Sequence, residues 1–261
     1  LRRDGDFRRQ RRSARRIANR TVKQCGNNGF RRPYGIVGRL KPVSLKLSPK
    51  KETKMIDTLI INAHPDPHST ASATNRMVAH LLTKLPAGSV QTVNLAEADI
   101  QPLDKAVLEM FTVTLFQGQQ PNKEQAALQA RLMSVVNQVK SARRLVIAYP
   151  MYNFAIPALL KNWLDNLVMP GETFRYGEDG TPKGLMGEHK VLLLQASGSV
   201  YSEGPMAQMD FASSYLKTLL GGFLGFASVD IVYAEGTAGD WDAAVQRACA
   251  KIDDVYDHFT S

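Results

Sequence analysis

Short apolar segments alternate with longer amphipathic ones throughout residues 55–261, and this pattern constrains the fold more than any other feature of the sequence. Five segments have the length and composition of buried strands: 58–63, 89–95, 145–149, 190–196 and 229–234. Six segments have apolar residues at helical spacing: 70–85, 103–116, 122–142, 156–168, 206–226 and 241–259. Two stretches are less regular, because 171–184 is rich in turn residues and glycines interrupt 206–226.

This alternation predicts an α/β fold with a five-stranded parallel sheet and helices on both of its faces. The expected strand order is 2-1-3-4-5. Right-handed crossovers then bring the carboxyl ends of the first, third and fourth strands to one place, where ligands of such sheets bind. We therefore look for a site in the three loops that follow these strands.

The charge of the chain is divided between two parts of opposite sign. Residues 1–54 hold 18 Lys and Arg against 3 Asp and Glu, a net charge of +15. Residues 55–261 hold 15 against 21, a net charge of −6. The basic part has too few apolar residues to offset the entropy of ordering it. We expect residues 1–54 to be disordered and residues 55–261 to form one domain.

Three interpretations of residues 1–54 follow from their composition. Their arginine runs can neutralise phosphates, which favours a nucleic-acid-binding arm. An organelle transit peptide is the second, although only Ser13 and Ser44 precede Ser48. The third is that Met55 is the natural start, because Lys51-Glu52 can be encoded by AAG-GAG, a ribosome-binding hexamer. Residues 1–54 would then be translated upstream sequence. We expect no nucleic-acid binding by residues 55–261.

Several classes of protein and site are excluded by what the sequence lacks. No apolar run reaches the roughly 18 residues that span a bilayer, so we expect no membrane span. Cys25 and Cys249 lie in different parts of the chain, which excludes a disulfide framework and favours a reducing cytoplasm. The five histidines form no metal-binding pattern, and the sequence around Ser197 lacks a nucleophile elbow.

The third strand-like segment ends in a group of aromatic and polar side chains, Met151, Tyr152, Asn153 and Phe154. Together they offer apolar contact and hydrogen-bonding groups, which suit a flat ring with one polar edge such as a flavin. The alternative is ordinary packing at a junction between a strand and a helix. We favour the flavin site because a buried carboxamide at Asn153 would need hydrogen-bond partners.

Hydroxyl groups are concentrated where the chain turns from the first strand into the next helix. Residues 64–75 read His-Pro-Asp-Pro-His-Ser-Thr-Ala-Ser-Ala-Thr-Asn. One hydroxyl suffices to cap a helix, whereas four in six positions favour a phosphate bound at the helix amino terminus. The glycine patterns of P-loops and dinucleotide folds are absent. His64 either donates to that phosphate or is an ordinary loop histidine.

The loop after the fourth strand consists largely of small residues, and begins Ala196, Ser197, Gly198 and Ser199. Small residues allow a ring to approach the backbone closely. The same composition is also typical of a flexible loop. Because this is the third loop at the same sheet edge, we expect these four residues to contact the ligand.

These motifs together resemble the bacterial FMN-dependent NADH:azoreductase, or NADH:quinone oxidoreductase, family. The matching stretches are P-M-Y-N-F at 150–154, L-K-N-W-L-D at 160–165, T-F-R-Y at 173–176, E-G-P at 203–205 and A-E-G at 234–236. The resemblance covers residues 55–261, and residues 1–54 have no counterpart in it. It implies a flavodoxin-like fold, a homodimer, FMN as cofactor, NADH as electron donor, and quinones and azo compounds as substrates.

The resemblance also assigns roles by position. It implies an FMN phosphate site at Ser72, Ala73 and Thr74, with His64 where the family has a serine. It implies a flavin ring bordered by residues 151–154 and by 196–199, where the family's S-R-G-G turn is replaced and its arginine is missing. Phe174 and Tyr201 are assigned to the substrate pocket, and Tyr201 stands where the family often has a histidine.

The implied reaction is a ping-pong transfer, in which NADH reduces the flavin and a quinone or azo compound then takes two electrons. Hydride transfer requires no amino-acid acid or base, so no residue is predicted to be catalytic. A flavin reductase and a flavodoxin-type electron carrier are the alternatives. The long segment 100–120 and Phe174-Arg175-Tyr176 favour an enzyme with a substrate pocket. A nucleic-acid-binding protein that uses residues 1–54 is the alternative from another class.

Overall fold

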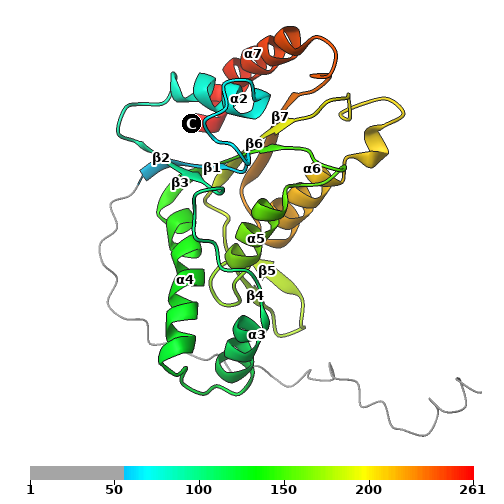
Figure 1. Cartoon of the computed structure of the whole chain (residues 1–261). Coiled ribbons are helices and arrows are strands. Elements are labelled where there is room, and N and C mark those ends of the chain that lie inside the picture. The colour runs from blue at the N-terminus through cyan, green and yellow to red at the C-terminus, as the bar shows by residue number, and fades with distance from the viewer. Residues whose placement is uncertain (1–55) are drawn as a thin grey trace, which may run out of the picture. The chain divides into compact units, whose positions relative to one another are not determined.

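The computed structural model describes residues 56–261, which form a five-stranded parallel sheet (Figure 1). Its strands are β1 (Ile56–Asn62), β2 (Val90–Asn94), β3 (Ala142–Pro150), β6 (Lys190–Ala196) and β7 (Ser228–Ala234). Their spatial order is β2-β1-β3-β6-β7, and all neighbours are parallel. Numbered by these five strands alone, the order is 2-1-3-4-5, so the predicted fold class and topology are confirmed. The predictions for residues 1–54, for Cys25 and for a start at Met55 lie outside the described residues.

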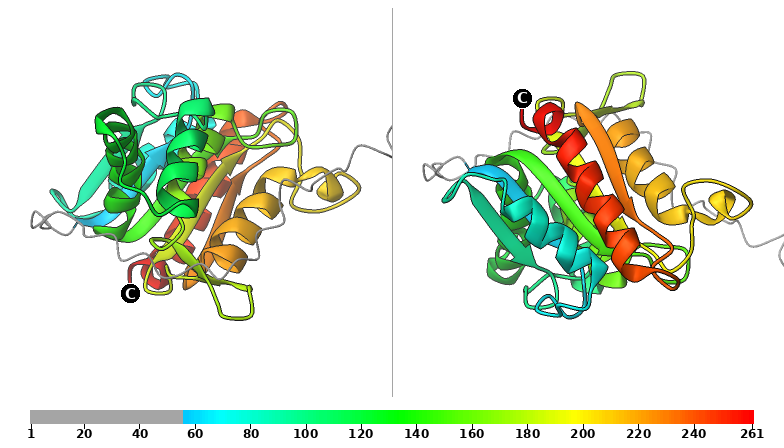
Figure 2. Two further views of the ribbon diagram at one scale, coloured as in Figure 1. Left: turned by 90° about the horizontal axis from the view of Figure 1, so that it is seen from below. Right: turned by 90° about the horizontal axis from the view of Figure 1, so that it is seen from above.

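Helices cover both faces of the sheet because successive strand residues point to opposite faces and both sets are apolar. On one face, α2 (Ala73–Leu82) and α7 (Trp241–Thr260) lie side by side (Figure 2) and bury Ile60, Val146 and Leu192. On the other face, α4 (Lys123–Lys140), α5 (Ala158–Leu167) and α6 (Phe211–Leu216) bury the alternate strand residues, among them Ile61 and Ile147.

Two predicted helices are shorter than expected, because each ends in π-helical turns. The segment 103–116 forms α3 (Lys105–Phe111) followed by η1 (Thr112–Phe116). The segment 206–226 begins with the short 3₁₀ turn η2 (Ala207–Met209), continues as α6, and then becomes η3 (Lys217–Phe223). Gly221 and Gly222 lie within η3, where their low helix propensity favours departure from the regular α-helical pattern.

The turn-rich stretch 171–184 contains a hairpin that the sequence analysis did not predict. Its strands are β4 (Phe174–Tyr176) and β5 (Pro182–Gly184), three residues each and antiparallel. Gly184 lies so close to the end of η3 that a Cβ atom there would come within 2.2 Å of the Leu224 carbonyl carbon. The hairpin therefore docks on the helical layer through a contact that only glycine allows.

Candidate active site

The three predicted loops meet at one edge of the sheet, where β1, β3 and β6 end side by side. Pro150 at the end of β3 pairs with Ala196 at the end of β6. The amide of Met151 then donates to the carbonyl of Ala196 at 2.7 Å. The segments that follow these strands are thus neighbours in space, as the predicted topology requires.

The amino terminus of α2 has the features of an anion site. Ser72 caps the helix, since its hydroxyl accepts from the Asn75 amide at 3.2 Å. Thr74 is 1% exposed, and its hydroxyl has no hydrogen-bond partner within residues 56–261. Such a buried hydroxyl is costly unless a ligand pairs with it. The first turn holds no acidic side chain, and the helix dipole adds partial positive charge there.

The loop between β1 and α2 is held in shape by two carboxamides. Asn62 Nδ2 donates to Asn75 Oδ1 at 3.1 Å, and Asn75 Nδ2 donates to the carbonyls of Asp66 and Ser69 at 2.9 Å each. These contacts connect the end of β1, the middle of the loop and the first turn of α2. The loop is therefore fixed by its own side chains.

His64 is half-buried and belongs to the same network. Its amide donates to Asn62 Oδ1 at 3.1 Å, and its Nδ1 lies 2.6 Å from the Asp66 carbonyl. The Asp66 amide also lies 3.1 Å from Nδ1, so the ring tautomer decides which of these two contacts forms. Within residues 56–261, no hydrogen bond uses Nε2 of His64.

A tight turn follows β3. Its backbone conformation, and not side-chain packing, explains the asparagine at position 153. Tyr152 and Ala155 exchange two backbone hydrogen bonds of 3.0 Å each. Between them, Asn153 and Phe154 both have positive φ angles, 49° and 67°, as in a type I′ turn. Asparagine tolerates this conformation, whereas phenylalanine adopts it rarely. Within residues 56–261, no hydrogen bond uses the amide of Asn153 or Phe154.

The argument that Asn153 is a buried carboxamide is wrong. Its side chain is exposed, as are those of Tyr152 and Phe154, so these residues are not core packing either. The sequence pattern could not distinguish a carboxamide that needs buried partners from one that suits a left-handed backbone. Asparagine serves the second purpose here.

The loop after β6 is tied to the loop after β7, and both contribute to the site. The Ser197 amide donates to the Ala234 carbonyl at 2.9 Å, and the Thr237 amide donates back to the Ser197 carbonyl at 3.2 Å. Further along, the ring of Tyr201 packs edge-on against Phe154, with centroids 6.1 Å apart and planes at 70°. Tyr201 therefore joins the predicted cluster at the sheet edge.

A buried polar network beneath this edge was missed by the sequence analysis. Tyr149 donates to the Gln195 side chain at 2.8 Å, and Asp210 accepts from the amide and hydroxyl of Ser213 at 2.9 and 2.6 Å. Burial, and next the charge of Asp210, raise the pKa of Tyr149 well above its ordinary value. Polar residues at matching positions of two apolar strands, Tyr149 and Gln195, were the available signal.

Phe174 lies elsewhere. It is 4% exposed and packs on Phe223 and Tyr176, with centroid distances of 4.6 and 5.5 Å. Its neighbour Glu172 bonds to Lys140, which lies just before β3 begins. Phe174 is thus near the amino ends of the strands, at the opposite edge of the sheet from Tyr201. Its assignment to the substrate pocket stays a prediction that a single copy of the chain does not explain.

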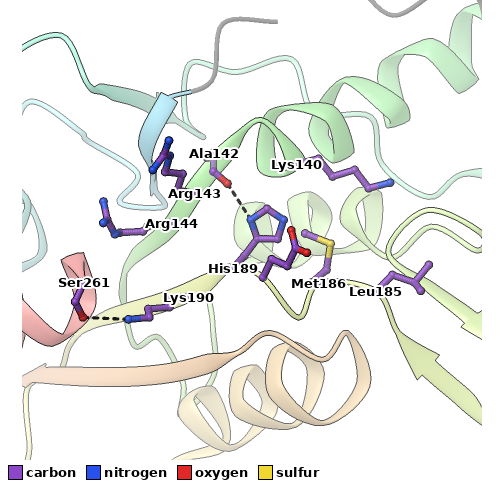
Figure 3. Close-up of a pocket in the computed structure, with 10 residues that line it drawn as sticks. Lys140, Ala142, Arg143, Arg144, Leu185, Met186, His189, Lys190 and Ser261 are labelled. Carbon is purple, nitrogen blue, oxygen red and sulfur yellow. Dashed lines mark hydrogen bonds between the residues drawn. The ribbon is translucent and has the colours of Figure 1, made fainter.

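A hollow of about 600 Å³ also lies at the amino ends of β3 and β6 (Figure 3), away from the candidate site. Basic side chains line it, and two of them are engaged with the end of α7. Arg144 bonds to the Thr260 carbonyl, and Lys190 donates to the His258 carbonyl at 2.9 Å. These contacts satisfy the last carbonyls of the helix, so the hollow is a structural feature of the domain.

Comparisons with known proteins agree with this geometry. A family model described as a flavodoxin-like fold matches residues 57–255. An FMN-dependent NADH:quinone oxidoreductase from Bacillus cereus is 33% identical over 208 residues, which cover 77% of this chain and 97% of the relative. The chain belongs to the FMN-dependent NADH:quinone oxidoreductase family. This membership confirms the resemblance inferred from the sequence motifs.

A second relative and a solved structure extend the match. An FMN-dependent NADH:quinone oxidoreductase from Ralstonia nicotianae is 38% identical over 192 residues, covering 71% of this chain and 90% of its own length. The crystal structure of an FMN-dependent NADH-azoreductase from Bacillus anthracis, in complex with FMN, superposes with a TM-score of 0.72 at 32% identity. The match covers 79% of this chain and 100% of that structure.

Two other properties of the described residues bear on the site. Within residues 56–261, no three or more His, Cys, Asp and Glu side chains are grouped in a way that could hold a metal ion. No helix in the same range has the length and hydropathy needed to cross a bilayer.

Proposed function

We propose that this chain binds FMN at the carboxyl edge of its sheet and uses NADH to reduce quinones, and that it also cleaves azo compounds reductively. One juxtaposition carries the proposal. Within residues 56–261, the hydroxyl of Thr74 and the amides of Asn153 and Phe154 have no hydrogen-bond partner, and these residues follow the neighbouring strands β1 and β3. The FMN-dependent NADH:quinone oxidoreductase and NADH-azoreductase that this chain resembles support the same cofactor and substrates.

The start of α2 suits a phosphate monoester. Thr74 has a hydroxyl to donate, and Ser72 can donate its own proton while it accepts from Asn75. The amides of Ala73 and Thr74 belong to the first helical turn, where no intrahelical acceptor exists. His64 can add a donor through Nε2. The phosphate is held without lysine or arginine.

The turns after β3 and β6 suit the ring. Met151, Tyr152 and Phe154 offer apolar surface on one side, and residues 196–199 border the ring on the other. The amides of Asn153 and Phe154 can donate to the polar edge of an isoalloxazine. Because the turn fixes both amides, these donors are already oriented before the ligand arrives.

When bound, FMN would supply the ping-pong redox chemistry between NADH and the acceptor, two electrons per turnover, of which a quinone needs one turnover and the cleavage of an azo bond two. The chain supplies orientation and limits access of water. Tyr201 and Phe154 form an aromatic wall beside the proposed ring site, against which planar acceptors can pack. No acid or base from the chain is needed, so we name no catalytic residue.

A homodimer completes the proposal. Leu108 and Phe116 are 58% and 64% exposed on α3 and η1, an apolar surface suited to a second copy. In such a dimer, Phe174 of one copy would line the pocket of the other copy. Within its own chain, Phe174 lies at the edge of the sheet opposite the candidate site. We place the enzyme in a reducing cytoplasm, because the described residues hold a free thiol, Cys249, and no disulfide.

The decisive experiment is an anaerobic visible spectrum of the purified full chain, recorded after FMN is added, after NADH, and after menadione. We expect a protein-bound flavin spectrum that NADH bleaches and menadione restores. A chain that retains no FMN would overturn the proposal. An azo dye in place of menadione tests the cleavage of azo compounds in the same cuvette.

The same experiment separates the alternatives. A flavin reductase would release reduced FMN, which passes through a filter that retains the protein. A flavodoxin-type carrier would hold FMN but would not be reduced rapidly by NADH. If the chain retains FMN but NADH does not bleach it, the protein is therefore a carrier and not an NADH-dependent enzyme.

A further inference from the structure

The carboxylate of Glu235 holds the loop after β6. Glu235 directly follows β7, and one of its oxygens accepts from the amides of Tyr201 and Ser202 at 2.8 and 3.0 Å. Its other oxygen accepts from the hydroxyl of Ser202. Within residues 56–261, Glu235 forms no ion pair with a basic side chain. The hydrogen-bond donors to the Glu235 carboxylate therefore come from the loop after β6.

These contacts fix the residue that faces the site. With its amide bound to Glu235, Tyr201 packs edge-on against Phe154 at 6.1 Å. Tyr201 is half-buried, whereas the next residues, 202–205, are exposed. A second carboxylate, Asp210, anchors the far end of the loop through Ser213. Within residues 56–261, no other hydrogen bond or aromatic pair involves Tyr201.

We propose that Glu235 is a positioning residue, which acts through Tyr201 to hold the aromatic wall of the acceptor site against Phe154. This inference rests on the proposed function. It assigns the binding of FMN and the fit of the acceptor to different contacts, which the positions of the three loops alone do not imply. FMN binding depends on the loops after β1 and β3 and on residues 196–199, whereas the fit of the acceptor depends on Tyr201, which the Glu235 contact positions. Changes at Glu235 should therefore alter the acceptor KM and leave FMN content unchanged.

Hydrogen exchange tests the contact itself, without reference to activity. In Glu235→Ala, the amides of Tyr201 and Ser202 should exchange at least about tenfold faster than in the original chain. Glu203→Gln is the matched control, because Glu203 is an exposed acid in the same loop for which no hydrogen bond is recorded within residues 56–261. It should leave the exchange unchanged. Equal exchange in the Glu235→Ala variant and the original chain would overturn the proposal.

A double-mutant cycle tests whether Glu235 acts through Tyr201. We expect Glu235→Ala and Tyr201→Ala each to raise the menadione KM by about fivefold, and the double variant to raise it no further than Tyr201→Ala alone. FMN content and the rate of flavin reduction by NADH should stay as in the original chain. Additive effects on KM, or loss of FMN in Glu235→Ala, would contradict the role assigned to Glu235.

The two proposals fail in different ways. If the original chain takes up no FMN, the proposed function fails, while hydrogen exchange still decides whether Glu235 holds the loop. If FMN and NADH oxidation are normal but Glu235→Ala leaves the menadione KM unchanged, the function stands and the positioning role is overturned.

Discussion

Two residues at the candidate site lower the stability of the ligand-free protein. The hydroxyl of Thr74 is buried without a partner in the described part of the chain, and Phe154 has a backbone conformation that phenylalanine disfavours. In a ligand-free protein both features cost free energy. Both are explained if the ligand pairs with the hydroxyl and uses the turn.

For Thr74→Val we expect opposite effects on stability and binding. Valine keeps the shape and removes the unpaired hydroxyl, so the FMN-free chain should unfold at an equal or higher urea concentration. FMN binding should weaken by about tenfold, the loss of one hydrogen bond to a charged group. Flavin fluorescence titration and urea unfolding measure the two effects. Ser72→Ala is the contrast, because losing the cap should lower the unfolding free energy by about 1 kcal/mol.

Variants of Asn153 test whether FMN binding depends on the backbone conformation or on the side chain of this residue. Asn153→Gly keeps the positive φ and should retain FMN, whereas Asn153→Leu should lose stability by about 1–2 kcal/mol and retain less FMN. The FMN bound after gel filtration and the thermal midpoint of each variant measure this. If glycine loses FMN as leucine does, the carboxamide itself binds the ligand.

These residues also show where sequence reasoning succeeds and fails. The three strand ends could be located because buried parallel strands are continuous apolar runs, and topology then brought the loops together. Tyr201 could be assigned only through a family resemblance. The Glu235 contact depends on how two loops fold back, which no local pattern encodes. The place of Phe174 could not be foreseen, because a short motif does not reveal which sheet edge it occupies.

Among the secondary-structure elements, tertiary packing determines features that local sequence propensity does not predict. The strands and long helices were predicted within a few residues, whereas the hairpin β4–β5 was not, because each strand has only three residues and no alternation to detect. The helix after β6 was predicted too long because its apolar spacing continues through the π-helical turns of η3.

Gly184 should be intolerant of any side chain. In Gly184→Ala the new methyl group would overlap the backbone at Leu224, so we expect the unfolding free energy to fall by about 2 kcal/mol. Gly222→Ala is the control, because nothing lies within 4 Å of its added Cβ and helix propensity would favour alanine. Urea unfolding compares the two. Similar effects would show that glycine content, and not the close contact, matters.

The packing of α2 on α7 should weaken in acid. Asp253 on α7 lies 2.6 Å from His80 of α2 and 2.8 Å from Lys84, which follows that helix. Hydrogen bonds from Lys84 and then His80 lower the pKa of Asp253. A lowered pKa means that this stabilisation is present above the unfolded value of about 3.9 and is lost as the pH falls through the folded value.

Asp253→Asn should therefore be less stable than the original chain at pH 7, and the difference should diminish as the pH falls below the unfolded value of about 3.9. Urea midpoints across pH 3 to 8 measure it. Asp254→Asn is the control, since its nearest basic partner, Lys251, is 3.5 Å away. A difference that persists in acid would mean that packing, and not charge, is responsible.

For the whole molecule, the proposed homodimer rests on an exposed apolar surface. Leu108 and Phe116 lie in the layer of α3 and η1, which no other described element covers at those side chains. The double variant Leu108→Glu and Phe116→Glu should sediment as a monomer and lose quinone reduction. The start of α2 is unchanged, so FMN should still bind. Leu82→Glu, an exposed residue on the opposite face, should leave the sedimentation coefficient unchanged.

The left-handed turn at Asn153 and Phe154 has a consequence for anyone who engineers this protein. Replacing Phe154 by glycine would relieve a conformation that costs about 1–3 kcal/mol, so it is among the first substitutions that a screen for heat resistance would recover. The same substitution removes the aromatic surface on which Tyr201 rests. Selection for survival of heating alone would thus favour chains that discriminate poorly among acceptors.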